Sequence, residues 1–172
     1  DYSLTGKARF NKKFSVDYTV SISTVTNQIG WAASQFIGGN QVIYFSRRDV
    51  KNVENILNLK YNFTNRMGIT FRTRHAWTKV QPQQLYELDA FGDLQTPASP
   101  YTGNVNQNYN FLSADMVYTW QFAQGSFINV VWKDIGGSFT NSFEKSYIKN
   151  LSRTMEGPQF TSLSLRIIYF LD

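Results

Sequence analysis

The sequence predicts an all-β chain that folds as an antiparallel transmembrane β-barrel. Three observations predict this class: apolar and polar residues alternate with a period of two along most of the 172 residues, aromatic residues lie at both ends of the apolar stripes, and short polar turns alternate with long loops. Aromatic residues make up 16% of the chain, which excludes a disordered protein. Because the chain has no cysteine, disulfides, thiolate metal sites and cysteine nucleophiles are excluded as well.

Each predicted strand has apolar side chains at alternate positions. In chain order the apolar stripes are Leu4, Gly6, Ala8 and Phe10; Phe14, Val16, Tyr18, Val20 and Ile22; Leu57, Leu59, Tyr61 and Phe63; Ile69, Phe71 and Trp77; Leu112, Ala114, Met116, Tyr118, Trp120 and Phe122; Ile128, Val130 and Trp132; and Leu163, Leu165, Ile167, Tyr169 and Leu171. The intervening positions are mostly polar, so each strand has one apolar and one polar face. Residues 24–52 fit either one very long hairpin turning at 38–40 or shorter strands joined by a loop. No segment shows helical periodicity.

The connections between these strands are of two kinds. Residues 11–13, 65–67 and 124–125 are tight turns of polar, turn-forming residues. The connections 81–108 and 141–159 are long, and structureless loops longer than about 15 residues are uncommon in compact soluble domains. Short periplasmic turns that alternate with long extracellular loops are typical of outer-membrane barrels.

Aromatic side chains at the ends of the apolar stripes are predicted to anchor the strands at the two membrane interfaces. The predicted anchors are Phe14, Phe63, Trp77, Trp120, Phe122, Trp132 and Tyr169. The pair Tyr169–Phe170, near the end of the last strand, resembles the assembly signal of outer-membrane barrels. A soluble sandwich or ligand-binding β protein is the alternative, because alternation alone does not identify the solvated face.

The number of strands predicts that this chain is a portion of a larger barrel. We count about seven strands, or nine if the hairpin at 24–52 is broken. Bacterial single-chain barrels have even strand numbers. We therefore expect residues 1–172 to be the C-terminal part of an outer-membrane barrel, with further strands upstream. A complete eight-stranded barrel with one strand misread is the alternative.

Basic residues are concentrated on the polar stripes, which would face the lumen of a barrel. The lumen-facing candidates are Lys60, Arg72, Arg74, Lys133 and Arg166. Together with Lys7 and Arg9 they outnumber Asp17 and Asp115, the two acidic residues placed on this face. This surplus predicts either a cationic wall that favours anions or pairing with carboxylates on other strands. It forms no exposed stripe, so the net charge of +5 does not indicate nucleic-acid binding.

The residues capable of catalysis or metal binding are few, and we expect no enzyme and no cofactor. His75 is the single histidine and is in register with Phe71 and Trp77, which predicts an interfacial side chain. Glu87, Asp89 and Asp93 offer oxygen ligands for Ca²⁺, with a solvated loop as the alternative. Aromatic residues in 81–108 and 141–159 predict docking of other outer-membrane or surface proteins or of a glycan, or a lid over the barrel mouth.

Several short runs of residues resemble a known family. These are Arg47-Arg48-Asp49, Val53-Glu54-Asn55, Tyr109-Asn110-Phe111, 117–123, Gly125-Ser126, Val131-Trp132-Lys133, 162–165 and 169–172. They resemble the C-terminal barrel of a family of Bacteroidota outer-membrane proteins that have an N-terminal β-sandwich like carbohydrate-binding module family nine. The resemblance implies that several hundred residues precede this chain, and it supplies no catalytic residues. It brings in a carbohydrate role only by analogy.

The functional prediction is a non-enzymatic β-barrel in the outer membrane of a Gram-negative cell, surrounded by outer-membrane lipid. It would act as a membrane anchor or as a subunit of a larger outer-membrane assembly. The alternative is a porin-like pore or transporter for anionic or sugar solutes.

Overall fold

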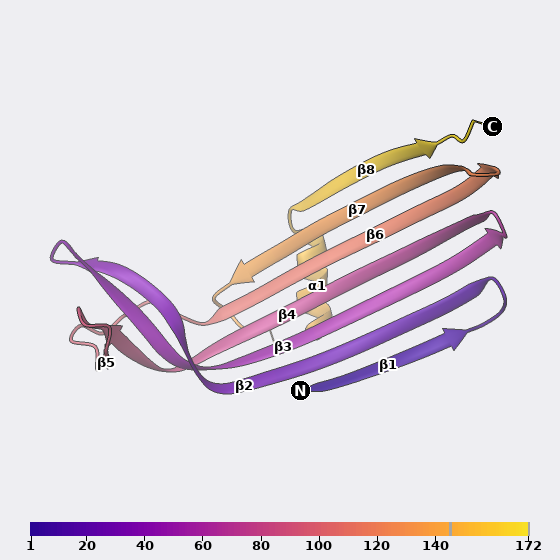
Figure 1. The fold of residues 1–172 in the computed structure, drawn as a ribbon. Helices are drawn as coiled ribbons and strands as arrows, with labels where there is room; N and C mark the ends of the chain where they lie inside the picture. Colours follow the sequence, from indigo (N-terminus) through magenta and orange to yellow (C-terminus); the bar gives the residue numbers. More distant parts are fainter. Residues whose placement is uncertain (145, 172) are drawn as a thin grey trace.

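The computed structural model describes residues 1–144 and 146–171; Lys145, in the predicted loop 141–159, and Asp172 lie outside it. The chain forms one antiparallel sheet whose long strands are neighbours in chain order (Figure 1). These strands are β1 (Tyr2–Arg9), β2 (Phe14–Ile37), β3 (Asn40–Thr64), β4 (Met67–Leu88), β6 (Gln107–Ala123), β7 (Ser126–Thr140) and β8 (Gln159–Ile168). The short β5 (Leu94–Gln95) pairs with β4. The all-β prediction is confirmed, and over the described residues the sheet is open, with β1 and β8 at its edges.

The register places the predicted stripes on two opposite faces. One row across all seven long strands is apolar: Ala8, Val16, Leu59, Phe71, Met116, Trp132 and Leu163. The adjacent row is largely charged: Lys7, Asp17, Asn58, Arg72, Asp115, Lys133 and Ser162. We call the faces that carry these rows the apolar face and the polar face. Successive side chains of a strand point to opposite faces. One strand register therefore determines which side chains lie together on the apolar face and which on the polar face.

Residues 24–52 form one continuous hairpin, the first of the two predicted alternatives. Gly38 and Gly39 make its turn with φ of 58° and 85°, a region that favours glycine. β2 and β3 have 24 and 25 residues and extend beyond the other strands at the end away from the short turns (Figure 1). Tyr44 is fully buried in this extension, where its hydroxyl accepts from Gln35 Nε2 at 2.8 Å and donates to Ser99 O at 2.9 Å. That bond ties the loop after β5 to the hairpin.

The first predicted long connection is shorter than expected, and the second, 141–158, has the predicted bounds to within one residue. β4 continues to Leu88, so the first irregular connection is 89–106 and contains β5. Sequence reasoning ended β4 before Pro82, which lacks a backbone N–H. The structure places Pro82 at a register irregularity opposite Arg48, where the ladder is already interrupted.

The second long loop contains a helix, α1 (Tyr147–Glu156), so the prediction that no segment is helical is wrong. Ser146 caps it, accepting from the backbone N–H of Lys149. The helix turns Tyr147, Asn150 and Thr154 toward the sheet, and each of these side chains carries a hydroxyl or an amide. Its buried side is polar, and the helical spacing of Ile148, Leu151 and Met155 was a signal that sequence reasoning missed. Within the described residues, no helix has the length and hydropathy needed to cross a bilayer.

The helix lies across β4, β6 and β7 on the apolar face (Figure 1). The ring of Tyr147 lies 5.2 Å from that of His75 and 5.9 Å from that of Trp77. His75 is only 4% exposed, so the expectation of an interfacial side chain is wrong, because α1 covers it. The short turns lie together at the opposite end of the sheet from the long connections, as predicted.

Candidate functional site

The five basic residues predicted to face a lumen lie together on the polar face, on β3, β4, β7 and β8. Three of them lie an even number of residues along their strands from the charged row, and therefore on the same face. They are Lys60, opposite Thr70; Arg74, opposite Ser113; and Arg166, opposite Asn129. The polar face is therefore the candidate functional surface.

Charges of alternating sign cross the polar face in one row, which we call the charged belt: Lys7, Asp17, Asn58, Arg72, Asp115 and Lys133. Asp115 lies between the two cations Arg72 and Lys133, and its Oδ1 is 3.7 Å from Lys133 Nζ. Opposite charges on facing strands attract across the ladder. The belt is thus largely self-neutralising, and it offers little net field to a solute.

One further ion pair on this face joins Arg74 to Glu54. Sequence reasoning missed Glu54 as a member of the polar face, because residues 53–56 were not assigned to the alternating pattern. Its even spacing from Asn58 and Lys60 was the available signal. With Glu54 and Asp115 engaged, Arg74 and Lys133 are less available to an external anion than predicted.

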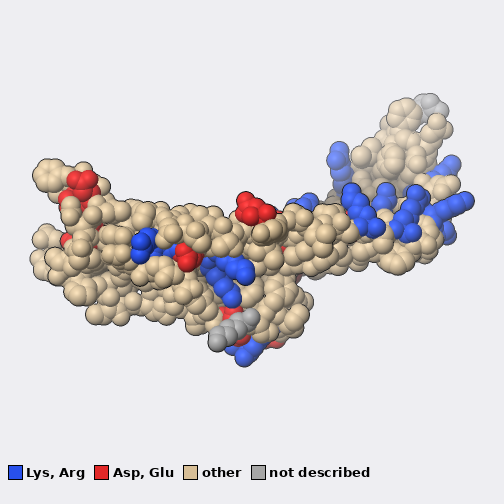
Figure 2. Space-filling model, turned by 90° about the horizontal axis from the view of Figure 1, so that it is seen from below, with Lys and Arg blue, Asp and Glu red and all other residues tan. Residues whose placement is uncertain are grey.

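The uncompensated positive charge lies beyond the belt, toward the short turns. We call this group the basic end: Arg9, Lys12, Lys13, Lys60, Arg66 and Arg166. The surrounding segments 9–16, 59–70, 117–132 and 162–171 contain no aspartate or glutamate. None of the six cations is in an ion pair among the described residues. Figure 2 shows lysine and arginine gathered at this end of the sheet, without acidic side chains beside them.

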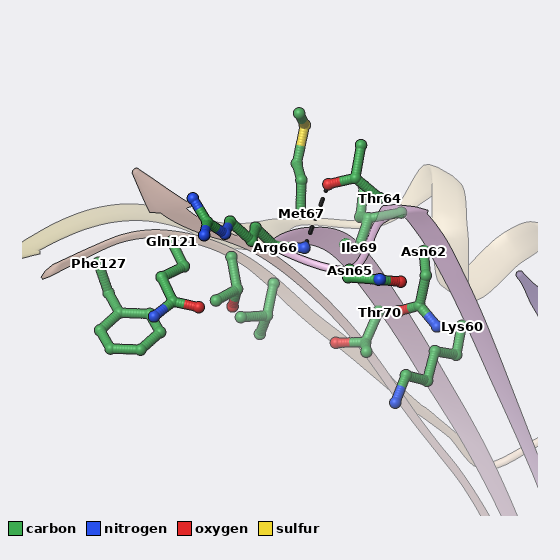
Figure 3. A pocket seen from close by; sticks show the side chains of 13 residues that line it. Lys60, Asn62, Thr64, Asn65, Arg66, Met67, Ile69, Thr70, Gln121 and Phe127 are labelled. Carbon is green, nitrogen blue, oxygen red and sulfur yellow. Dashed lines mark hydrogen bonds between the residues drawn. The ribbon is translucent and has the colours of Figure 1, made fainter. Parts of the chain in front are cut away.

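Two hollows adjoin at the basic end and share Lys60 and Asn62. The larger, of about 290 Å³, is also lined by Arg66, Thr70 and Gln121. In Figure 3 the side chains of Lys60, Thr70 and Phe127 point to one side of the strands, and Met67 points to the other. The second hollow, of about 270 Å³, is lined by the 9–15 turn region. Ammonium, guanidinium and amide groups all donate hydrogen bonds, so this end is suited to anionic oxygen atoms.

The predicted aromatic anchors fall into two groups. Phe14, Phe63, Trp120, Phe122 and Tyr169 lie near the short turns. Several of these rings are in contact, as in Phe122 and Tyr169, whose centroids are 6.2 Å apart. Trp120, Phe63 and Tyr169 are 41%, 42% and 65% exposed, as membrane-facing anchors would be.

Trp77 lies nearer the long connections, Trp132 lies mid-strand opposite Met116, and neither ring is freely exposed. Trp77 is 6% exposed, and its Nε1 donates to Asn108 Oδ1 at 2.6 Å. Trp132 is half-buried and lines a groove beside α1. Sequence reasoning predicted both rings as interfacial anchors, because it did not include the helix that lies over this part of the face.

A buried asparagine cluster attaches α1 to the sheet: Asn108, Asn110 and Asn150. Asn150 Oδ1 accepts from Asn110 Nδ2 at 3.1 Å and from Asn108 Nδ2 at 3.4 Å, and Asn150 Nδ2 donates back to Asn110 Oδ1. Each of the three is at most 5% exposed. No sequence signal identified this cluster, because asparagine outside a recognised element is usually read as a turn residue.

The acidic residues proposed for Ca²⁺ organise the loop instead. Asp89 Oδ1 accepts from the backbone N–H groups of Asp93 and Phe91, both at 2.9 Å, and these bonds, that from Asp93 foremost, lower the pKa of Asp89. Glu87 accepts from the N–H of Ala98 at 2.9 Å. In the part of the chain that the structure describes, no three acidic or histidine side chains gather as a metal site would require.

The charged belt predicts a salt-dependent difference between two aspartates. Asp115→Asn leaves Arg72 and Lys133 facing each other across a neutral residue, so it should lower the free energy of unfolding by up to about 1 kcal/mol in low salt. Asp17→Asn is the matched control, because Asp17 faces only Lys7 and the neutral Asn58. Urea unfolding in detergent micelles measures both. The loss of unfolding free energy caused by Asp115→Asn should disappear in about 1 M salt. Equal losses of unfolding free energy in the two variants would contradict a cooperative belt.

Comparison with known proteins identifies a family but no characterised relative. The whole chain, residues 1–172, matches the family model described as a domain of unknown function, DUF5916. No curated protein and no solved structure matches the chain. Since the family model covers every strand and the helix, the chain belongs to the DUF5916 family.

Proposed function

We propose that residues 1–172 form the membrane-embedded sheet of an outer-membrane β-barrel that has no enzymatic activity. In this proposal the apolar face contacts lipid, the polar face lines the interior, and the barrel is a membrane anchor or a subunit of a larger outer-membrane assembly. A Gram-negative outer membrane is the expected location, because membrane β-barrels of this kind are its characteristic proteins.

The observation that carries the proposal is the length of the apolar band. On β6 the band begins at Leu112, just past the asparagine cluster under α1, and ends at Phe122 beside a short turn. Residues 112–122 match the 9–11 or so residues that a tilted strand needs to cross the hydrocarbon core. Aromatic side chains bound this band at the short-turn end, and a polar cluster covered by a helix bounds it at the other.

The exposure of the apolar face supports lipid contact over a soluble sandwich. Leu163, Leu165 and Ile167 of β8 are 72%, 64% and 60% exposed, and Tyr18 of β2 is 44% exposed. A soluble sandwich would cover such a face with a second layer. In the described residues that layer is limited to α1, which leaves most of the band uncovered.

The open edges support a larger assembly. β1 runs toward a short turn, and β8 ends at Ile168, opposite Phe127 at the short-turn end of β7. The two edge strands therefore run in the same direction, so antiparallel closure needs an odd number of further strands between them. An unpaired backbone group in lipid costs several kcal/mol, so these edges must be paired in a membrane. β5 has two residues and does not cross the sheet, which argues against a complete eight-stranded barrel within this chain.

A second copy of the chain would not supply this closure. A two-fold axis along the membrane normal keeps both copies in the same orientation. It would join β8 of each copy to β1 of the other, and these strands are parallel because both run toward the short turns. The remaining strands are therefore expected from the same polypeptide or from a different protein. The resemblance to Bacteroidota outer-membrane proteins with a carbohydrate-binding-module-like domain agrees with the first source. Connection 89–106 and α1, on the outer side, are the surfaces proposed for protein or glycan partners.

The second candidate function is a pore for anionic or sugar solutes, and the basic end favours it. The test is planar-bilayer recording with the full protein. Lys60→Glu together with Arg166→Glu should lower the anion-to-cation permeability ratio, whereas Lys133→Gln, at a position paired with Asp115, should change it less. Absence of conductance, or a ratio that the reversal does not change, would exclude the pore.

The membrane proposal predicts opposite behaviour of two neighbouring valines on β7. Val130 is on the apolar face and Val131 on the polar face, opposite Tyr118 and Val117 respectively, and both are partly exposed. Val130→Arg should prevent outer-membrane assembly, because arginine facing the middle of the bilayer costs roughly 2–4 kcal/mol. Val131→Arg should assemble normally. Outer-membrane fractionation and heat-modifiable gel mobility measure both variants, and equal assembly of the two would refute lipid contact of the apolar face.

A further inference from the structure

A groove of about 460 Å³ lies between α1 and the apolar face. Its walls are mainly apolar: Leu57, Phe71, Leu112, Ala114, Trp132 and Met155. The volume is within the range of sites that bind small molecules. Because these wall residues belong to the same face as the apolar band, the groove is continuous with the surface proposed to contact lipid.

One end of the groove is polar. Tyr147 closes it with a hydroxyl that accepts from Asn55 Nδ2 at 2.9 Å and lies 2.8 Å from His75 Nδ1. Among the described residues, the hydroxyl of Tyr147 therefore joins the amide of Asn55 to the imidazole of His75. The groove combines apolar walls with one polar end formed by these three side chains.

The orientation of α1 matches an interfacial helix. At 100° per residue, Ile148, Leu151 and Met155 share one side, and Lys149 and Arg153 share the opposite side. Ile148 and Met155 are 72% and 57% exposed. The cations lie 3.7 Å and 3.1 Å from Glu144 Oε2, and Glu156 is on the same side of the helix, so this side carries charges of both signs. Such a helix lies in the membrane–water boundary with its apolar side in the acyl region.

We propose that this groove binds one acyl chain of a membrane lipid, with the chain between the sheet and Met155 and its carbonyl end toward His75 and Tyr147. The inference rests on the proposed lipid contact of the apolar face. In water, each Å² of apolar wall surface left in contact with solvent would forgo roughly 25 cal/mol of hydrophobic free energy. A lipid chain removes that surface from water, its carbonyl end lies beside the hydroxyl of Tyr147, and the charged side of α1 lies on the headgroup side.

The test is photolabelling of the full-length protein in non-ionic detergent with a palmitic acid that carries a mid-chain diazirine. Labelling should saturate, map to residues 112–114 and 151–155, and be displaced by unlabelled palmitic acid. Ala114→Trp, and independently Thr73→Phe, should fill the groove and reduce the apparent affinity about tenfold. Ala8→Trp is the matched control, because Ala8 lies on the same face but on edge strand β1, outside the groove, and it should label like the parent.

Labelling that does not saturate, that spreads over β1 and β8, or that both groove variants leave unchanged would overturn the site. These results are distinguishable from a failure of the membrane proposal. If Val130→Arg blocks assembly and Val131→Arg does not, while the groove is not labelled, lipid contact stands and the acyl-chain site is wrong. If the two valine variants behave alike, both proposals fail.

Discussion

Every side-chain arrangement in this chain depends on one register of backbone hydrogen bonds between antiparallel strands. With a period of two, that register places Phe71 and Met116 in an apolar row and, one residue on, Arg72 and Asp115 in a charged row. A slip of one residue at β4 would move Arg72 onto the apolar face and bury its charge against aliphatic side chains. Cross-strand attraction in the charged belt and burial or lipid contact on the opposite face therefore favour the same register.

The helix determines where the apolar face ends. Next to the long connections, the apolar face carries amide side chains and the imidazole of His75. Placing such polar groups in contact with lipid or among aliphatic side chains is costly. α1 covers these groups and satisfies several of them through Asn150 and Tyr147. Its own apolar side continues the band through Ile148 and Met155. One ten-residue helix thus gives the band its outer boundary and creates the groove beneath it.

The alternating pattern predicted the strands, the faces and the three short turns, because a period of two is a local property of the sequence. It also predicted that the five basic candidates share a face. The helix was missed although Ile148, Leu151 and Met155 have helical spacing, and Asn150 and Thr154 face the sheet where an ordinary amphipathic helix has leucine or valine. The helix covers His75 and Trp77. Because the helix was not predicted, the burial of these two side chains was not predicted either. Glu54 was missed because residues 53–56 were not assigned to the alternating pattern, although its even spacing from Asn58 and Lys60 was visible in the sequence.

The central claim is that the apolar face contacts lipid and the polar face contacts water. Because residues 1–172 contain no cysteine, single cysteines placed at each position of 112–121 on β6 can be spin-labelled without background from this part of the protein. In reconstituted membranes, electron paramagnetic resonance measures collision of each label with oxygen, which partitions into lipid, and with a water-soluble nickel chelate. The account predicts oxygen-accessible labels at even positions and chelate-accessible labels at odd ones. Even-numbered labels accessible to the chelate would contradict it.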